Sequence, residues 1–171
     1  LIETFRWSAA QGFARLEGHL ARLGRSAAQM GFALDVSDLR RRLDECSRAW
    51  ADGQDRRVRI LLHRSGDTEL SSQTLEPVPV RPWRVALSDH KVDAGDPFLR
   101  HKTTRRPIHD AAARAATEAG LDEALILNQY GRLADGSRTT LFLRKEGILL
   151  TPPLRDGALP GVLRQDLIES G

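Results

Sequence analysis

Three prolines near the middle of the chain limit what it can fold into. Pro77, Pro79 and Pro82 lie within six residues. Proline lacks the backbone N–H that helix interiors and central strands need, so no regular element is expected to cross this stretch. The chain has 171 residues, which is enough for two small domains that each have a hydrophobic core. We therefore predict an N-terminal domain, a proline-rich linker and a C-terminal domain, over residues 1–78, 79–83 and 84–171.

The first region contains both strand and helix patterns. Apolar and polar side chains alternate over residues 1–7, as in a half-buried strand. Apolar residues recur every three or four positions from Leu16 to Met30, which predicts an amphipathic helix ended by Gly31. A small α/β domain is completed by a helix from Asp35–Ser37 to about Ala51, and by strands 56–63 and 69–76 around a turn at 65–67.

The second region shows a similar mixture of elements. A strand is expected over residues 83–87, and an Ala-rich helix over residues 108–119, ended by Gly120. The pair Asp135-Gly136 is by itself a common turn signal. Further strands are expected over 122–128, 139–144 and 147–150, with turns at 129–131 and 145–147 and a last helix from Pro160-Gly161.

Composition narrows the classes of function. The formal net charge is +3 and the pI is about 9.6, but acidic and basic residues are interspersed, so a nucleic-acid-binding surface is not favoured. Small anionic molecules are the expected partners. No apolar run approaches the roughly 20 residues of a membrane span, so we expect a soluble cytoplasmic protein without a membrane partner. The single Cys46 excludes an intramolecular disulfide, gives no metal-ligand spacing, and is expected to be buried.

Lysine is rare in this chain, and one lysine stands in an unusual segment. The sequence has three lysines against 23 arginines, and Lys102 lies in the segment 101–106, His-Lys-Thr-Thr-Arg-Arg. An amine can form an imine or move a proton near neutral pH, whereas a guanidinium cannot. Lys102 is therefore a candidate catalytic residue. From composition alone, a solvated basic cluster is the simpler interpretation of this segment.

Two further features stand out, and each has an ordinary alternative. Residues 157–164 place two glycines around a helix start, with Pro160 near its first position. This arrangement exposes backbone N–H groups and suits a phosphate, although it is also typical of a loop-to-helix junction. Arg22 is a basic residue in the otherwise apolar stripe of the first predicted helix. It is equally typical of a surface arginine whose charge reaches solvent.

The order and spacing of these features together resemble a known family. The matching segments are residues 3–6, 19–23, 102–104, 128–142 and 151–164. They resemble the class IV aminotransferases, the fold type IV pyridoxal-phosphate enzymes, which include branched-chain and D-amino-acid aminotransferases and 4-amino-4-deoxychorismate lyase. The resemblance covers nearly the whole chain. It is closest to the lyase-like branch, in which Lys-Thr-Thr and Thr-Pro-Pro-Leu segments are typical.

The resemblance implies an architecture. The fold would be α/β (α+β), a two-domain fold type IV pyridoxal-phosphate enzyme with a small N-terminal α/β domain and a larger C-terminal mixed-sheet domain. The active protein would be a homodimer. Family members usually continue past the final helix into another strand and a Ser/Thr-rich loop, so the C-terminal end is expected to be incomplete.

The resemblance also implies a role for each residue of the cofactor site. Lys102 stands where the family has the lysine that binds pyridoxal phosphate covalently and then moves the substrate proton. Asp135, 33 residues later, stands where the family usually has a Glu that pairs with the pyridine nitrogen and makes the ring an electron sink. Arg22 matches the arginine that contacts the cofactor phosphate. The remaining cofactor-binding positions are Thr140, where Asn is usual, Gly161 and Val162 at the helix start, and Leu163, where many members have Thr.

Two residues of the first region are candidates for contact with the substrate. Thr4 matches a threonine near the reacting carbon in the lyase branch, where it assists proton transfer. Arg59 alternates with apolar residues on a predicted strand and would hold a substrate carboxylate. Both are equally typical of ordinary strand residues. His109 stands where relatives often have Tyr, and we expect it on a helix surface.

These roles favour a 4-amino-4-deoxychorismate lyase, which forms 4-aminobenzoate and pyruvate. The 4-aminobenzoate is used in folate biosynthesis. The substrate is a small anionic molecule with an amino group. An aminotransferase for branched-chain or D-amino acids is the alternative within the family. A third interpretation is a non-catalytic relative that binds an anion or nucleic acid, which the replacements at Asp135, Thr140 and Leu163 support.

Overall fold

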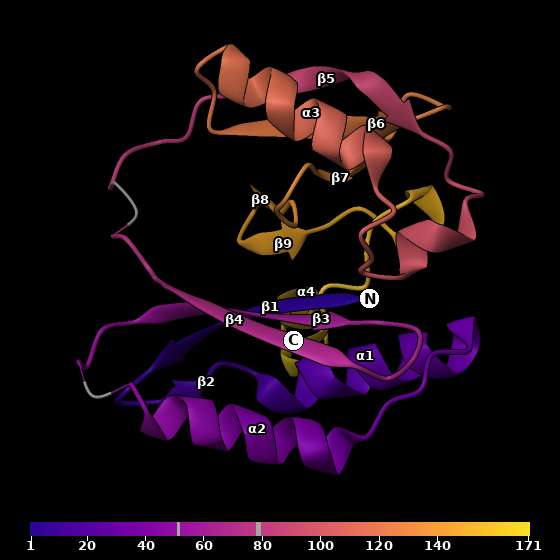
Figure 1. Ribbon diagram of the computed structural model, residues 1–171. Coiled ribbons are helices and arrows are strands. Elements are labelled where there is room, and N and C mark those ends of the chain that lie inside the picture. Colours follow the sequence, from indigo (N-terminus) through magenta and orange to yellow (C-terminus); the bar gives the residue numbers. More distant parts are fainter. Residues whose placement is uncertain (51, 78–79) are drawn as a thin grey trace. The chain divides into compact units, whose positions relative to one another are not determined.

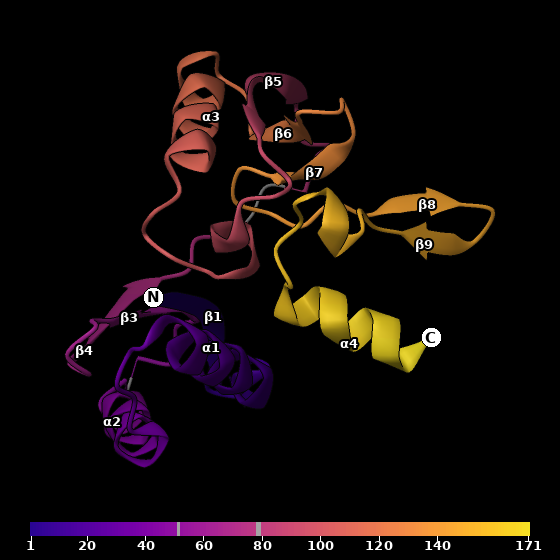
Figure 2. The ribbon, with the colours of Figure 1, turned by 90° about the vertical axis from the view of Figure 1, so that its right-hand side faces the viewer.

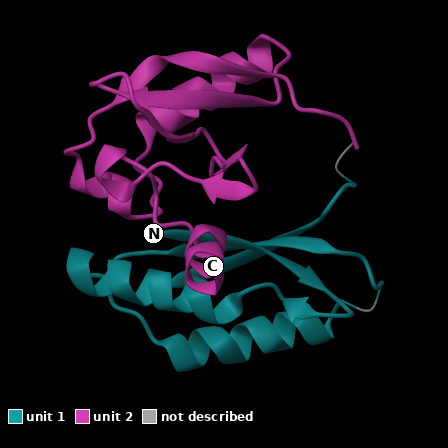
Figure 3. Ribbon diagram, turned by 180° about the vertical axis from the view of Figure 1, so that it is seen from behind, with its two compact units in different colours: residues 1–78 teal, residues 79–171 magenta. Residues whose placement is uncertain are grey.

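The chain folds into two compact units. The structure is a computed structural model that describes residues 1–50, 52–77 and 80–171. Unit 1 is Leu1–Val78 and unit 2 is Pro79–Gly171, drawn in teal and magenta in Figure 3. Each unit has its own hydrophobic core. The finer division into two domains and a linker at 79–83 stays a prediction, and Pro79 lies outside the described residues.

Unit 1 is a four-stranded antiparallel sheet with two helices on one face (Figure 1). The strand order is β2-β1-β3-β4, so β1 and β3 are central. This arrangement confirms the predicted small α/β unit with a hairpin at its end. The strands are β1 (Ile2–Ser8), β2 (Gly12–Phe13), β3 (Arg56–Leu62) and β4 (Thr68–Thr74), and the helices are α1 (Leu16–Met30) and α2 (Val36–Arg48).

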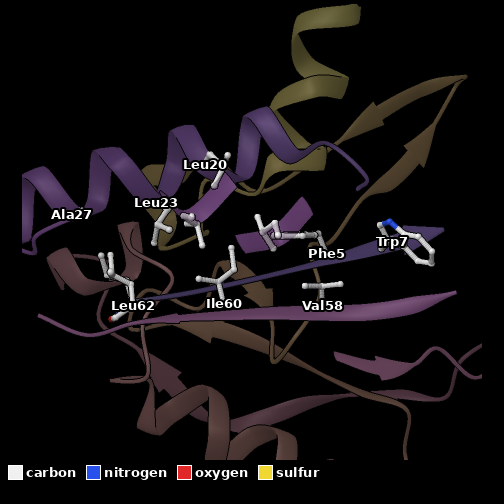
Figure 4. Packing of buried hydrophobic residues seen from close by; sticks show 11 residues of the cluster. Phe5, Trp7, Leu20, Leu23, Ala27, Val58, Ile60 and Leu62 are labelled. Carbon is white, nitrogen blue, oxygen red and sulfur yellow. The ribbon is translucent and has the colours of Figure 1, made fainter. Parts of the chain in front are cut away.

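The alternation of side chains along β1 and β3 builds the core of unit 1. Phe5 of β1 and Val58 and Ile60 of β3 are buried, and they pack with Leu20 and Leu23 of α1 (Figure 4). Successive residues of a strand point to opposite faces, so the side chains between them lie on the face without helices. Full burial of one such apolar side chain contributes roughly 1.5–3 kcal/mol. This cluster is therefore a major source of the stability of unit 1.

Local signals set the ends of both helices in unit 1. α1 ends at Gly31, which has a φ of 68°, a conformation that glycine adopts without strain. α2 begins after Asp35, whose carboxylate accepts a hydrogen bond from the N–H of Asp38 at 2.9 Å. The end of α1 and the start of α2 follow the predicted pattern because the determinants of each lie within a few residues.

Two expectations for α2 are changed by the structure. The helix ends at Arg48, and the predicted end at Ala51 lies outside the described residues. Cys46 is half-buried rather than buried. The reason is its place in the last turn of α2, where it lines a small apolar pocket with Trp50 and Leu70 instead of facing the centre of the sheet.

Unit 2 contains a three-stranded mixed sheet in the order β5-β6-β7. β5 and β6 are parallel, and the helix α3 provides the crossover that parallel neighbours require, whereas β7 is antiparallel to β6. A hairpin and a last helix follow (Figure 2). The elements are β5 (Val85–Val92), η1 (Pro97–Arg100), α3 (Pro107–Glu118), β6 (Glu123–Asn128), β7 (Leu133–Gly136), β8 (Leu143–Lys145), β9 (Ile148–Leu150), η2 (Leu154–Asp156) and α4 (Val162–Ser170).

Three strand predictions for unit 2 need correction. The strand expected over 83–87 is observed as β5, which extends to Val92. The strand expected over 139–144 is wrong, except that its last two residues belong to β8. The strand β7 is not predicted. Asp135-Gly136 signals a turn in isolation, yet both residues belong to β7. Glycine is required there for another reason, because an added Cβ on Gly136 would lie 2.5 Å from the Oγ1 of Thr139. The chain folds back only after the glycine, over residues 137–139.

Candidate active site

Lys102 lies in the segment that joins η1 to α3 in unit 2, and its side chain is half-buried. The Oγ1 of Thr103 accepts a hydrogen bond from the N–H of Arg105 at 2.7 Å, which fixes the turn after Lys102. The guanidinium carbon of Arg105 lies 3.8 Å from the ring centroid of Phe98, a cation–π contact. Arg105 therefore packs onto this segment instead of only adding charge to its surface.

Asp135 places a buried carboxyl at the end of β7. It is 6% exposed, and its oxygens accept hydrogen bonds from the N–H groups of Gly136 at 3.1 Å and Leu159 at 3.2 Å. Burial raises the pKa of Asp135 to about 7, although these two N–H groups and the charge of Lys102 act in the opposite direction. Lys102 and Asp135 thus interact electrostatically within unit 2, and the carboxyl can gain or lose a proton near neutral pH.

Glu123, the first residue of β6, is a site residue that the sequence prediction missed. Its side chain is almost fully buried, and its carboxylate accepts hydrogen bonds from the residues that follow Asp135. The available signal was an acidic residue directly before the apolar run 124–127. Acidic side chains are rarely buried unless they are paired or hydrogen-bonded, so its position at a buried strand indicated specific partners.

The start of α4 lies beside Thr140. An added Cβ on Gly161 would come within 3.0 Å of the Oγ1 of Thr140, so only glycine leaves this space open. Val162 begins the helix and is buried, whereas Leu163 is 44% exposed. The first N–H groups of a helix point outward and attract anions. The N–H of Gly161 donates to the carbonyl of Leu159 at 2.8 Å, so the backbone donors of this helix start are those of Val162 and Leu163, and the Leu163 side chain adds none.

In unit 1, Arg22 is buried against Glu3. The Nε and Nη2 atoms of Arg22 donate to the two oxygens of Glu3 at 2.8 and 2.5 Å, and the Nδ1 of His19 lies 2.7 Å from the same carboxylate. Burial alone would raise the pKa of Glu3, but the hydrogen bonds from His19 and Arg22 outweigh it and hold the pKa below its ordinary value. Arg22 is 5% exposed, so the interpretation as a surface arginine is wrong.

Thr4 and Arg59 are direct cross-strand partners on β1 and β3. They lie on the sheet face opposite the helices, where Thr4 is half-buried and Arg59 is exposed. Two other arginines of this face are paired: Arg6 with Asp55 at 2.6 Å, and Arg57 with Gln73 at 2.7 Å. Among the described residues, Arg59 has no such hydrogen bond or ion pair, so its guanidinium is available to a ligand.

The predicted residues therefore form two groups. Unit 1 brings together Thr4 and Arg59 on one sheet face and carries Arg22 on the other side of the sheet. Unit 2 carries the predicted cofactor residues Lys102, Asp135, Thr140, Gly161, Val162 and Leu163.

His109 does not lie on the helix surface, contrary to the expectation. It is half-buried on α3, and burial lowers its pKa to about 4, assisted by the charges of Arg106 and Lys102 and opposed by Asp110 and Glu123. The imidazole is therefore neutral at pH 7.

Comparison with known proteins links these residues to one family. The family model described as "Amino-transferase class IV" matches residues 1–171. The structure of a putative amino-acid aminotransferase from Mesorhizobium loti superimposes on the whole chain with a TM-score of 0.93 and 38% sequence identity, and the chain covers 83% of that protein. Together these matches support the predicted fold type IV architecture over the full length of the chain.

Curated relatives of two activities are similar to this chain. A putative aminodeoxychorismate lyase from Schizosaccharomyces pombe is 25% identical over 164 residues, which cover 91% of this chain and 68% of that protein. A putative branched-chain-amino-acid aminotransferase from Methanocaldococcus jannaschii is 37% identical over 90 residues, which cover 53% of this chain and 31% of that protein. The matched regions therefore span only part of each relative.

Proposed function

Because the chain belongs to the class IV aminotransferases, a family of pyridoxal-phosphate-dependent enzymes, we propose that it acts as a 4-amino-4-deoxychorismate lyase. Such an enzyme releases pyruvate from its substrate and leaves 4-aminobenzoate. The observation that carries the proposal is the pairing of Thr4 with Arg59 on one open sheet face. A hydroxyl beside an available guanidinium suits a substrate that presents a carboxylate near the carbon that exchanges a proton.

The residues of unit 2 fit the cofactor of this family. Gly161 leaves a space beside Thr140 that a Cβ would fill, and the start of α4 supplies N–H donors for a phosphate. Asp135 offers a buried carboxyl that can pair with a ring nitrogen. Leu163 lacks the side-chain donor that many members have at this position, so phosphate binding would depend more on backbone groups.

Each residue then has a distinct role. When bound, pyridoxal phosphate supplies an electron sink for the charge that develops on the substrate carbon as its proton leaves. Lys102 would bind the cofactor covalently through its amine and, once released, move the substrate proton. Asp135 would hold a proton between its carboxylate and the ring nitrogen. Thr140, Gly161, Val162 and Leu163 would fix the cofactor in one orientation, which lowers the entropic cost of reaction.

Arg59 and Thr4 would act on the substrate. The substrate of the lyase carries two carboxylates, and a guanidinium without a protein partner can bind one of them with two parallel hydrogen bonds. The Oγ1 of Thr4 would assist the transfer of a proton to the pyruvate that leaves. Loss of the Arg59 charge is expected to raise KM more than it lowers kcat, because a carboxylate contact is present before and during the reaction.

The test combines spectroscopy and product analysis. The purified protein with added pyridoxal phosphate should show an absorbance band near the visible that borohydride removes, and Lys102→Ala should abolish that band. Incubation with aminodeoxychorismate should then yield 4-aminobenzoate, while pairs of amino and keto acids should give no transfer. A protein that gains no band would exclude the cofactor roles, and a protein that gains the band but forms no 4-aminobenzoate would exclude the lyase.

An aminotransferase is the second candidate, because the Mesorhizobium loti protein, at 38% identity over the whole chain, is described as a putative amino-acid aminotransferase. In this case Lys102 would return the proton that it takes from the substrate, and no pyruvate would be eliminated. Transfer of an amino group between a branched-chain or D-amino acid and a keto acid, without 4-aminobenzoate from aminodeoxychorismate, would favour this activity.

We also propose that the active protein is a homodimer, as the family resemblance implies, and that it is cytoplasmic, as expected from the sequence. None of the helices in the described parts of the chain is both long and apolar enough to cross a membrane. Light scattering of the protein with bound cofactor would measure the mass of the assembly, and a mass of one chain would contradict the dimer.

A further inference from the structure

Glu123 accepts five hydrogen bonds although its side chain is buried. It is 2% exposed, and its partners are all donors without a net charge. Burial alone would raise the pKa of Glu123, but hydrogen bonds from Ser137, Thr139 and neighbouring backbone N–H groups outweigh it and lower the pKa. The donors are the N–H groups of Ala124, Ser137 and Arg138, and the hydroxyl groups of Ser137 and Thr139.

Four of these five bonds come from the loop that joins Asp135 to Thr140. The Oε1 of Glu123 accepts from the N–H of Ser137 at 3.1 Å and from its hydroxyl, and Oε2 accepts from the hydroxyl of Thr139 at 2.7 Å. The loop is also closed on itself, because the N–H of Gly136 donates to the carbonyl of Thr139 at 2.9 Å. A buried carboxylate therefore fixes the short connection between two predicted cofactor-binding residues.

A second contact ties the same loop to the Lys102 segment. The Nη2 of Arg106 donates to the carbonyl of Ser137, and its Nε donates to the carboxylate of Asp110 on α3 at 3.0 Å. Arg106 is the residue directly before the first residue of α3 and follows Lys102 by four residues. The positions of Lys102 and Asp135 are thus connected through Arg106, Ser137 and Glu123.

We propose that Glu123 is a positioning residue of the cofactor site, which sets the distance between Lys102 and Asp135 through the 136–139 loop. The inference rests on the proposed function, because the distance between Lys102 and Asp135 matters only if both residues bind the cofactor. A fixed loop keeps Asp135 buried and aimed at one point, and a site of this kind loses affinity when its supporting residues loosen.

Glu123→Gln tests the inference while keeping the shape of the side chain. The amide can accept at only one of the two oxygen positions, so the donors from Arg138 and Thr139 lose their carboxylate partner. The affinity of the cofactor-free protein for pyridoxal phosphate is expected to fall about tenfold or more, as for loss of a hydrogen bond to a charged group. The pH at which the absorbance of the bound cofactor changes should also shift, since Asp135 becomes more exposed.

Two further variants control for the effect on folding. Glu118→Gln changes an exposed glutamate at the end of α3 and should leave both cofactor affinity and the pH profile unchanged. Ser137→Ala removes one hydroxyl donor to Glu123 with little change in volume, and should weaken cofactor binding in the same direction as Glu123→Gln. Circular dichroism of each cofactor-free variant measures whether it is folded.

The outcomes separate the inference from the proposed function. If the wild-type protein binds the cofactor and Glu123→Gln and Ser137→Ala bind it equally well with the same pH profile, Glu123 does not position the site. If Glu123→Gln is unfolded, Ser137→Ala alone decides by the same comparison. A wild-type protein that binds no pyridoxal phosphate overturns the proposed function and, with it, this inference.

Discussion

Each unit contains a buried glutamate, but the two are stabilised by different partners. Glu3 in unit 1 is held by the side chains of Arg22 and His19, which can carry positive charge. Glu123 in unit 2 is held by backbone N–H groups and hydroxyls, which carry only dipoles. The first arrangement joins a strand to a helix, and the second closes a loop. Breaking a charge pair of this kind leaves a buried charge without its partner and lowers stability, whereas a ring of dipoles fixes the local shape of the backbone.

The hydrophobic cores of the two units also differ, in the size of their buried side chains. The buried cluster of unit 1 contains large side chains such as Phe5, Trp7 and Leu43. Four of the six buried residues in the cluster of unit 2 are alanines, the others being Val92 and Ile126. Less apolar area per residue is buried in such a core, so hydrogen bonds contribute more to fixing the positions of the backbone and side chains in unit 2. Substitutions of polar residues should therefore affect stability in unit 1 and site geometry in unit 2.

Loss of the cation in unit 1 is expected to have the largest effect on stability. Arg22→Ala leaves the carboxylate of Glu3 buried without its main partner, and breaking a buried pair in this way costs about 3–5 kcal/mol. By contrast, Ser137→Ala in unit 2 removes one hydroxyl of several donors and should cost about 1 kcal/mol. Urea unfolding of the cofactor-free protein measures both values.

Arg25→Ala is the matched control for the arginine, since Arg25 is exposed on the same helix. It should change the free energy of unfolding by less than about 0.5 kcal/mol. Equal losses for Arg22→Ala and Ser137→Ala would contradict the distinction between a charge pair and a ring of dipoles.

Two buried carboxyl groups, Asp135 in unit 2 and Glu3 in unit 1, should contribute to the pH dependence of stability in opposite directions. The folded-state pKa of Asp135 in unit 2 is about 7, above its ordinary value of 3.8, so the folded state binds more protons between these values. Stability of the cofactor-free protein should then fall as pH rises from about 4 to 7, by at most about 1.4 kcal/mol per pH unit. Asp135→Asn should remove this fall, which urea unfolding at pH 5 and pH 7.5 measures.

Glu3 in unit 1 provides the opposite case. Its folded-state pKa is lowered, so the stability that it contributes is present above the ordinary value of 4.5 and is lost as pH falls through the folded-state pKa. Asp135→Asn should leave this acid-side loss unchanged. An Asp135→Asn variant whose stability still falls between pH 4 and 7 would show that another group causes the dependence.

The two units also differ in how well the sequence predicts their elements. Gly31 and the Asp35 cap of α2 have determinants within a few residues, so pattern and propensity located both helices of unit 1. β7 was not predictable in this way. Its end depends on Gly136, which must be glycine because Thr139 and Glu123 approach it, and Glu123 is distant in sequence. A local turn signal cannot report a contact of that kind.

The residues of the candidate site also differ in how far the sequence predicts them. The rarity of lysine makes Lys102 a candidate, but Lys102, Asp135 and Arg22 are assigned to a cofactor site only because their order and spacing resemble a family. Glu123 was missed because the three loop residues that donate to it lie 14 to 16 residues further along the chain, and burial of a carboxylate depends on partners that fold around it. The assigned roles of the site residues stay predictions until the variants are measured.

A pair of glycine substitutions gives the smallest and most direct test of the comparison. Gly136→Ala in unit 2 would place a Cβ 2.5 Å from the Oγ1 and 2.7 Å from the carbonyl oxygen of Thr139, and such overpacking costs about 1–3 kcal/mol. Gly24→Ala in α1 of unit 1 meets no atom within 4 Å and should stabilise the protein by about 0.5–1 kcal/mol, because alanine loses less backbone entropy in a helix. Thermal unfolding of both variants measures whether each substitution lowers or raises the stability of the protein. If Gly136→Ala were neutral, the 136–139 loop would have room to move, and Glu123 could not hold it in one position.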